Sequence, residues 1–135
     1  MAARYLLDTN TASYIIKGNR PALDRHLLKV PMATLATSAL TEGELRFGAA
    51  RLPSATGLHR LIEEFLARVT ILPWDSPAAQ QYGELRATLE RQGQPIGNID
   101  LLIAAQALAL NLVLVTNDKA FHRIRKLKIE DWTKS

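Results

Sequence analysis

The sequence predicts an α/β domain, a three-layer sandwich in which a mostly parallel sheet of four to five strands is flanked by helices. Short apolar runs alternate with longer segments of helical periodicity along the 135-residue chain. Strands separated by helices tend to pair in parallel, because the helix returns the chain to the same end of the sheet. At this length we expect a single domain, residues 1–135, with one hydrophobic core.

Composition limits the classes of chemistry that this chain can perform. It contains no Cys, which excludes thiol nucleophiles, disulfides and thiolate metal sites. The 47% hydrophobic and 22% charged content is typical of a globular protein, and no apolar run is long enough to span a bilayer. Without a signal peptide pattern at the N-terminus, we expect a cytoplasmic protein with no membrane partner. The net charge of +4 is compatible with a polyanionic partner such as nucleic acid.

The first predicted strand ends on a carboxylate. Residues 5–7 form a short apolar run, and Asp8 follows it directly. We expect Thr9 or Asn10 to cap a helix that ends at Gly18. Ligands of open parallel sheets bind in the crevice outside the carboxyl ends of the strands, so Asp8 is a candidate site residue. The alternative is that Asp8 only caps the helix.

A basic region and a second strand come next. Pro21 fits the first turn of a helix over residues 21–30, and residues 32–37 predict the second strand. Ser38 is a plausible cap for a helix over residues 39–52. The basic side chains of this region could form a solvated helical face or a rim that contacts phosphates; they are Lys17, Arg20, Arg25 and Lys29.

Helical geometry separates the two acids of the 39–52 helix. Glu44 shares a face with Leu40 and Phe47, so we expect it to point toward packed structure. Glu42 lies four residues before Arg46, which is the spacing of an exposed ion pair. Glu44 is therefore the candidate site residue, and Glu42 is the surface residue.

The middle of the chain supplies core elements. Apolar residues repeat at helical spacing over residues 58–66, and residues 69–72 predict a short strand. Asp75 or Ser76 can cap the next helix, which should end near Gly93.

The helix predicted over residues 99–110 is almost uniformly apolar, which is typical of a helix in the protein interior. Asp100 lies in its first turn, where a favourable interaction with the helix dipole is one explanation. However, Asp100 shares a face with Ile103, Ala104 and Ala107, which turns it toward the interior. A buried carboxylate is costly unless something pairs with it, so Asp100 is a candidate functional residue.

The next strand, residues 112–115, again delivers a carboxylate at its end, in Thr116-Asn117-Asp118. Residues 127–129 predict a last short strand. The basic side chains in between could line an approach for phosphates or form an ordinary exposed helix; they are Lys119, Arg123, Arg125, Lys126 and Lys128.

We expect the four carboxylates Asp8, Glu44, Asp100 and Asp118 to meet at one edge of the sheet. Close carboxylates repel, by roughly 4 kcal/mol for a pair about 4 Å apart at an intermediate dielectric. Oxygen ligands without Cys or a pair of His residues favour Mg²⁺, or Mn²⁺, over Zn²⁺. Such a cation on carboxylates supports phosphodiester hydrolysis. Asp8 and Asp100 would be the principal ligands, with Glu44 and Asp118 completing the site directly or through water.

Four motifs, in this order and spacing, resemble those of a known family. They are Leu6-Leu7-Asp8-Thr9-Asn10; Thr41-Glu42-Gly43-Glu44-Leu45 with Phe47-Gly48; Ile96-Gly97-Asn98-Ile99-Asp100 with Ile103-Ala104-Ala105; and Val115-Thr116-Asn117-Asp118 leading to Phe121. The chain resembles, over nearly its whole length, the PIN-domain ribonucleases, specifically the VapC (virulence-associated protein C) toxins of bacterial toxin-antitoxin pairs. Asp8, Glu44, Asp100 and Asp118 match the four acids of the family, and Asn10 and Thr116 occupy supporting polar positions.

The resemblance implies a PIN-like fold and a Mg²⁺-dependent endoribonuclease. It also implies a homodimer and inhibition by a cognate VapB antitoxin, whose C-terminal segment occupies a groove. The relatives that look most similar cleave initiator tRNA in the anticodon loop, which makes tRNA a candidate substrate. The basic segments would then hold the RNA backbone.

Two other classes of function make different predictions. A non-catalytic RNA-binding or partner-binding module on the same fold predicts RNA binding that is insensitive to Mg²⁺, and the complete set of four acids argues against it. A phosphotransfer receiver domain needs adjacent acids after the first strand and a phosphoacceptor Asp after a middle strand. Here Thr9 follows Asp8, and Asp75 comes only after Pro73, which argues against this class too.

Overall fold

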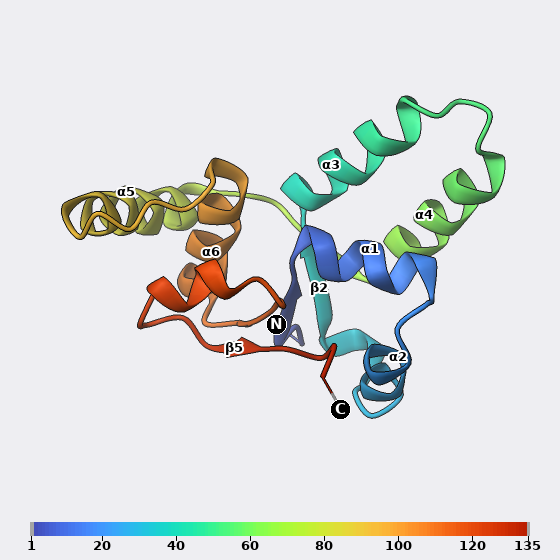
Figure 1. Ribbon diagram of the computed structural model, residues 1–135, viewed down its shortest axis with the longest axis horizontal. Helices are drawn as coiled ribbons and strands as arrows, with labels where there is room; N and C mark the ends of the chain where they lie inside the picture. The colour runs from blue at the N-terminus through green and yellow to red at the C-terminus, as the bar shows by residue number, and fades with distance from the viewer. Residues whose placement is uncertain (1, 135) are drawn as a thin grey trace.

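A parallel sheet forms the centre of the protein. The computed structural model describes residues 2–134. Within that range five strands pair in the order β3-β2-β1-β4-β5, and all four pairings are parallel. The predicted α/β sandwich is therefore confirmed (Figure 1). The strands are β1 (Tyr5–Leu7), β2 (Leu35–Ser38), β3 (Thr70–Leu72), β4 (Val113–Val115) and β5 (Ile129–Glu130).

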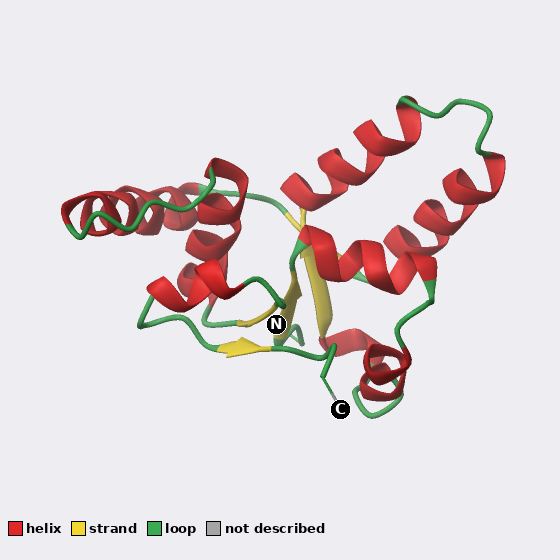
Figure 2. Cartoon of the chain, in the orientation of Figure 1, coloured by secondary structure: helices red, strands yellow, loops and turns green. Residues whose placement is uncertain are grey.

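Helices cover both faces of this sheet, as Figure 2 shows. One face packs against the fifth and sixth helices and the C-terminal segment, and the other packs against the first, third and fourth helices. The helices are α1 (Thr9–Lys17), α2 (Pro21–Leu27), α3 (Ala39–Ala50), α4 (Thr56–Arg68), α5 (Ser76–Arg91) and α6 (Asn98–Leu110), with two 3-10 helices, η1 (Met32–Thr34) and η2 (Lys119–Arg123).

The pleat of the strands divides the core into two clusters. Leu6 packs with residues of α5 and α6, whereas the next residue, Leu7, packs with residues of α1, α3 and α4. Leu114 and Val115 of β4 divide in the same way. Successive side chains of a strand point to opposite faces, and here both faces are covered, which explains why the strands are continuous apolar runs.

Helix ends largely follow the predicted capping chemistry, with one correction. The prediction that Thr9 or Asn10 caps α1 is wrong, because Asp8 is the N-cap and its side chain accepts a hydrogen bond from the backbone amide of Thr11. Gly18 ends α1 at φ 66°, a left-handed conformation that glycine adopts without strain. Ser38 caps α3 as predicted, and Asp75 caps α5.

Several elements are shorter than predicted. The helix predicted over residues 21–30 ends at Leu27, because Pro31 disfavours helical backbone in the residue before it. The strand predicted over residues 32–37 begins with η1 and becomes β2 only at Leu35. The strand predicted over residues 127–129 is shifted and shorter: β5 consists of Ile129–Glu130. It lies at the edge of the sheet and pairs with β4.

The strand order creates a crevice beside β1. From β1 the chain moves to β2 and β3 on one side, and β4 and β5 fill the other side. The carboxyl ends of β1 and β4 therefore flank the point where the strand order reverses, which is where parallel α/β sheets bind ligands. Among residues 2–134, none of the helices has the length and apolar character needed to cross a membrane.

Candidate active site

Asp8 occupies the centre of the crevice edge, at the carboxyl end of β1. Its side chain is buried, with the residue 2% exposed. One carboxylate oxygen, Oδ1, accepts a hydrogen bond of 2.8 Å from the Thr11 amide, and the other, Oδ2, accepts one of 2.5 Å from the Thr116 hydroxyl. One oxygen therefore caps α1, and the other belongs to a polar network that reaches β4. The role of Asp8 as a site residue stays a prediction.

Burial changes the acidity of Asp8. Removal of the carboxylate from water raises the pKa of Asp8 above its ordinary value. The hydrogen bonds from Thr116 and Thr11 act in the opposite direction, and the negative charge of Asp118 raises the pKa further. The protein thus keeps a carboxylate in an environment that penalises its charge, which is a common feature of functional sites.

Thr116 connects two of the predicted acids. Its hydroxyl donates to Asp8 Oδ2, and the same oxygen accepts a hydrogen bond of 3.0 Å from the backbone amide of Asp118. Asp118 caps η2, because its Oδ1 accepts from the Ala120 amide at 2.9 Å. Thr116, which is 2% exposed, therefore fixes the backbone that carries Asp118 relative to the Asp8 carboxylate.

Glu44 reaches the site from the neighbouring helix α3. The Thr9 hydroxyl donates a hydrogen bond of 2.5 Å to Glu44 Oε1. The same Thr9 oxygen lies 3.1 Å from the hydroxyl of Thr41, which is fully buried. Because Thr9 directly follows Asp8, this bond brings the second predicted acid next to the first.

The reason given for choosing Glu44 over Glu42 was partly wrong. Glu44 does not point into packed structure: it is exposed, and Phe47 on the same face is 62% exposed. The buried face of α3 is formed instead by Thr41, Leu45 and Ala49. The assignment of Glu42 is confirmed, since its carboxylate lies 3.0 Å from Arg46 Nε in the expected ion pair.

The charges of the other three acids act on Asp100. It lies in the first turn of α6 and is partly buried. Partial burial raises the pKa of Asp100, and the negative charges of Asp118, Asp8 and Glu44 raise it further. These charges influence Asp100 only because they lie within electrostatic range of it. The other three acids, which come from distant parts of the chain, therefore lie within electrostatic range of Asp100.

Two threonines of the site were not predicted. Thr9 was interpreted only as a possible cap, whereas its hydroxyl holds Glu44. Thr41 lies three residues before Glu44, a spacing that puts both on one side of a helix, and this was the available signal. Asn10, the other predicted supporting residue, is exposed and forms no side-chain hydrogen bond within residues 2–134, so its role stays a prediction.

Two of the three histidines have contacts within the fold, and the third, His122, is exposed on η2. His26 stacks on Trp132 with ring centroids 4.3 Å apart, and His59 contacts the backbone carbonyl of Leu52 at 2.9 Å. The donor set of the site is therefore one of carboxylates, with hydroxyls behind them, which is the chemistry that Mg²⁺ and Mn²⁺ prefer.

The four carboxylates suit a divalent cation in donor type and in charge. Within residues 2–134 no three Asp, Glu or His side chains are already spaced as a metal-ligand group. The carboxylates nevertheless carry like charges that raise the pKa of Asp100, and a cation relieves that repulsion. The expectation of Mg²⁺ or Mn²⁺ stays a prediction that this electrostatic arrangement supports.

Comparisons with known proteins agree with this geometry. The model of the family described as PIN domain matches residues 5–127. The tRNA(fMet)-specific endonuclease VapC of Shigella flexneri is 36% identical over 131 residues, which cover 96% of this chain and 98% of that protein. Ribonuclease VapC1 of Haemophilus influenzae is 42% identical over 133 residues, with the same coverage of both chains.

A solved structure extends the likeness to three dimensions. The crystal structure of VapBC2 from Rickettsia felis, bound to a DNA fragment from its promoter, contains a chain that matches with a TM-score of 0.87 and 35% identity. The match covers 93% of this chain and 96% of that one. The predicted resemblance is therefore confirmed.

Proposed function

This chain belongs to the PIN-domain family, among its VapC ribonucleases, and from that premise we propose that it is a Mg²⁺-dependent endoribonuclease that hydrolyses phosphodiester bonds in RNA. The observation that carries the proposal is the hydrogen-bond geometry at this edge of the sheet. Thr9, which follows Asp8, donates to Glu44, and Thr116 joins Asp8 to the backbone of Asp118. Burial raises the pKa of Asp100, and the charges of the other three acids raise it further. Such an enzyme acts where cellular RNA is, in the cytoplasm. Mn²⁺ is the alternative cation for the same oxygen donors.

The proposed mechanism divides the work between carboxylates and hydroxyls. Asp8 and Asp100 would be the principal ligands of the cation, and Glu44 and Asp118 would complete the site directly or through water. When bound there, Mg²⁺ supplies positive charge for the scissile phosphate, the attacking water and the leaving oxygen. Thr9 holds Glu44, and Thr116 joins Asp8 to the backbone of Asp118, so both acids are oriented before RNA arrives.

Initiator tRNA is the substrate that we propose to test first. The name of the Shigella flexneri relative specifies tRNA(fMet), and that protein is 36% identical to this chain. The test uses purified protein, total RNA and sequencing of new RNA ends. We expect a cut in the anticodon loop of initiator tRNA, and cuts spread over many RNAs would contradict this specificity.

Cleavage itself is tested with labelled RNA and a single substitution. The Asp8→Asn variant keeps a side-chain oxygen that can cap α1, so we expect it to fold. It should cleave RNA at least about 100-fold more slowly than the unmodified protein, because a ligand and its charge are lost. Chelation with EDTA should stop the unmodified protein.

The substitution of an acid outside the site provides the control. Glu90 lies on α5 and pairs with Arg86, so Glu90→Gln removes one carboxylate without touching the site. We expect Glu90→Gln to cleave at the normal rate. Full activity in folded Asp8→Asn protein would contradict the role proposed for Asp8. RNA binding without Mg²⁺-dependent cleavage would indicate a non-catalytic module instead.

We propose a VapB-type antitoxin as the protein partner. The similar structure from Rickettsia felis is that of a VapBC complex, which supports this assignment. The surface that suits an apolar antitoxin segment is a groove of about 180 Å³ between α1, α2 and α4, lined by Ile15, Leu27, Met32, Leu61 and Phe65 among others. Met32 and Leu61 are 49% and 41% exposed, so the groove presents apolar side chains to a partner.

A homodimer is the proposed assembly, as the family resemblance implies. Light scattering coupled to size-exclusion chromatography measures the mass directly. We expect about twice the chain mass of 15.0 kDa. A mass of one chain at working concentration would overturn this part of the proposal.

A further inference from the structure

A second binding surface adjoins the acidic site. Past Asp118, the ten residues from Lys119 to Lys128 contain five Lys or Arg residues and no acid. All five are exposed, and within residues 2–134 none of them forms an ion pair. We call this segment the basic strip; its cations are Lys119, Arg123, Arg125, Lys126 and Lys128.

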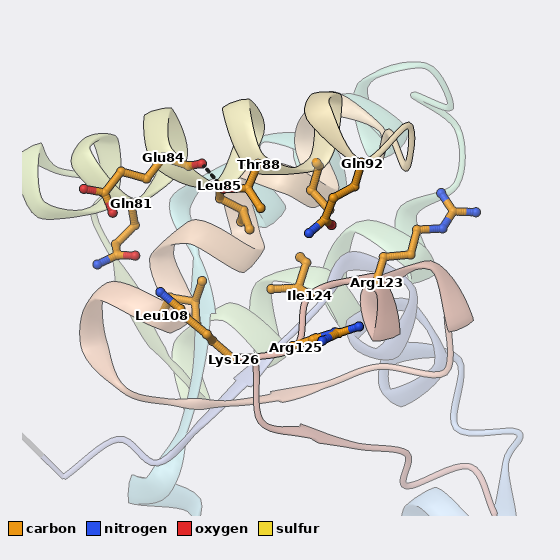
Figure 3. Close-up of a pocket in the computed structure, with 11 residues that line it drawn as sticks. Gln81, Glu84, Leu85, Thr88, Gln92, Leu108, Arg123, Ile124, Arg125 and Lys126 are labelled. Carbon is orange, nitrogen blue, oxygen red and sulfur yellow. Dashed lines mark hydrogen bonds between the residues drawn. The ribbon is translucent and has the colours of Figure 1, made fainter.

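The basic strip leads from the acidic site into a cavity. The cavity has a volume of about 290 Å³ and lies between α5 and residues 123–126 (Figure 3). This volume is near the lower end of the range for small-molecule sites, about 300 to 1,000 Å³, and suits one nucleobase rather than a folded peptide. We call it the α5 cavity.

The lining of the α5 cavity has two chemical parts. Its apolar part consists of Leu85, Leu89, Leu108 and Ile124. Figure 3 shows Leu85 and Thr88 extending from α5 toward the segment that carries Ile124. An aliphatic surface can pack against the face of a base, as the aromatic side chains of many single-stranded RNA-binding proteins do.

The polar part supplies hydrogen bonds and positive charge. Gln81, Thr88 and Gln92 line the cavity from α5, and Arg125 and Lys126 line it from the opposite wall. Glu84 is the only acid in the lining, against three cations with Arg123 included. Amides and a hydroxyl can bond the edge of a base, and the surplus of positive charge suits the adjacent phosphates.

Arg123 joins the cavity to the catalytic region. Its guanidinium donates a hydrogen bond of 2.5 Å from Nη1 to the backbone carbonyl of Pro95, in the loop that leads to α6 and Asp100. Asp118 begins η2, and Arg123 ends it. A 3-10 helix rises about 2 Å per residue, so the five residues of η2 span roughly 10 Å. At about 3.4 Å per stacked nucleotide, this distance corresponds to roughly three nucleotides.

We propose that the substrate RNA leaves the four-acid site along the basic strip and inserts one base, roughly three nucleotides from the cut, into the α5 cavity. The proposal rests on the proposed ribonuclease function and adds a subsite that recognises a nucleotide away from the cut. The phosphates follow the uncompensated cations, and the inserted base lies against Leu85 and Leu108.

RNA binding without cleavage tests the charge half of the proposal. The measurement is fluorescence anisotropy of a labelled substrate RNA on the Asp8→Asn protein in EDTA, over a range of salt concentrations. We expect Arg125→Gln with Lys126→Gln to weaken binding and to lower the slope of log affinity against log salt by about 1.4, or 0.7 per lost phosphate contact. Arg60→Gln, which removes an exposed cation of α4 outside both basic segments, should change neither quantity.

A cavity-filling substitution tests the base-insertion half. Thr88→Trp fills the α5 cavity, and Gln80→Trp adds the same side chain to an exposed position of α5 outside the lining. We expect Thr88→Trp to weaken binding about 5- to 100-fold, with an unchanged salt slope, because one stacked base is lost. One abasic position in the RNA should cause the same loss, and the two losses should not add. Circular dichroism confirms that each variant is folded.

Each other outcome has a defined meaning. If the unmodified protein cleaves RNA while the strip and cavity variants bind it normally, the subsite is wrong and the proposed function stands. If those variants lose antitoxin binding but keep RNA binding, the surface belongs to a protein partner and the proposal is overturned. If the unmodified protein cleaves no RNA, the proposed function is wrong. The subsite proposal, which rests on it, is then wrong as well.

Discussion

At the residue scale, hydroxyl groups organise the carboxylates. Asp8 is held by Thr116 and by the Thr11 amide, whereas Glu44 is exposed and its position depends on Thr9. A hydroxyl behind a ligand carboxylate orients it and reduces the entropy that is lost when the site assembles. The threonines therefore matter to activity without touching the RNA.

The Thr9 hydroxyl can be removed without changing the shape of the side chain. Thr9→Val should slow RNA cleavage about 10- to 100-fold, because Glu44 loses its hydrogen-bond donor. Thr9→Ser keeps the hydroxyl and should restore most of the activity. The check is the rate of cleavage together with calorimetric Mn²⁺ affinity, which should fall in Thr9→Val and recover in Thr9→Ser. Equal activity of the Val and Ser variants would show that the hydroxyl has no such role.

The raised pKa of Asp100 makes the free energy of unfolding depend on pH. Its pKa is raised in the folded protein from the ordinary value of 3.8, so the folded state binds the proton more tightly than the unfolded chain does. Stability without a divalent cation therefore falls as pH rises from that ordinary value through the raised one. Asp100→Asn should be more stable than the unmodified protein in EDTA at about pH 7, and the gap should close at about pH 4.

Thermal unfolding in EDTA at several pH values measures this gap. Addition of Mg²⁺ should narrow it at neutral pH, because the cation favours the charged carboxylate. If the difference in stability between Asp100→Asn and the unmodified protein is the same at every pH, folding does not raise the pKa of Asp100.

The sequence could identify the acids but not their surroundings. Asp8, Asp100 and Asp118 were predicted because strand ends and a buried helix leave a recognisable apolar pattern beside a carboxylate. The link from Thr9 to Glu44 spans 35 residues of sequence, and no local pattern encodes such a contact. Helical periodicity also misjudged Glu44, since it cannot tell which apolar stripe of α3 faces the core.

At the element scale, α6 is the most constrained helix. Six of its residues are buried, and Gln106 is fully inaccessible to solvent. The Gln106 Nε2 donates to the backbone carbonyls of Leu72 and Pro73 at 3.3 and 3.1 Å, which ties α6 to the end of β3. Because Asp100 lies at the start of the same helix, this anchor also fixes the position of the acid.

Loss of the Gln106 anchor should destabilise the fold. Gln106→Leu leaves two carbonyls without their donor, and we expect the free energy of unfolding to fall by about 1–3 kcal/mol. Urea denaturation measures the change. Gln80→Leu, an exposed position on α5, is the control and should stay within about 0.5 kcal/mol. If both variants lose the same stability, the anchor has no special role.

At the scale of the whole molecule, surfaces of different chemistry lie in separate parts of the fold. The α5 cavity and the basic strip lie on the side of α5 and η2, and the apolar groove lies among α1, α2 and α4. Strand alternation with helices predicted the parallel sheet, but strand order and these surfaces depend on tertiary packing. They could not be predicted from periodicity alone.

The apolar groove makes a prediction about inhibition. Leu61→Glu places a charge in the groove and should weaken inhibition by the proposed VapB-type antitoxin by at least about tenfold, while RNA cleavage without antitoxin is unchanged. Leu52 is 53% exposed but lies outside the groove, so Leu52→Glu is the matched control. The measurement is residual RNA cleavage against antitoxin concentration. Resistance to inhibition in Leu52→Glu alone would place the antitoxin elsewhere.

Calorimetric titration with Mn²⁺ is the most direct measurement of whether four distant acids form one cation site. The unmodified protein should bind Mn²⁺, and Asp8→Asn, Asp100→Asn and Asp118→Asn should each weaken binding by about tenfold or more. Glu90→Gln, which removes a carboxylate on α5, should leave binding unchanged. Normal Mn²⁺ affinity in folded Asp8→Asn and Asp100→Asn proteins would contradict the account.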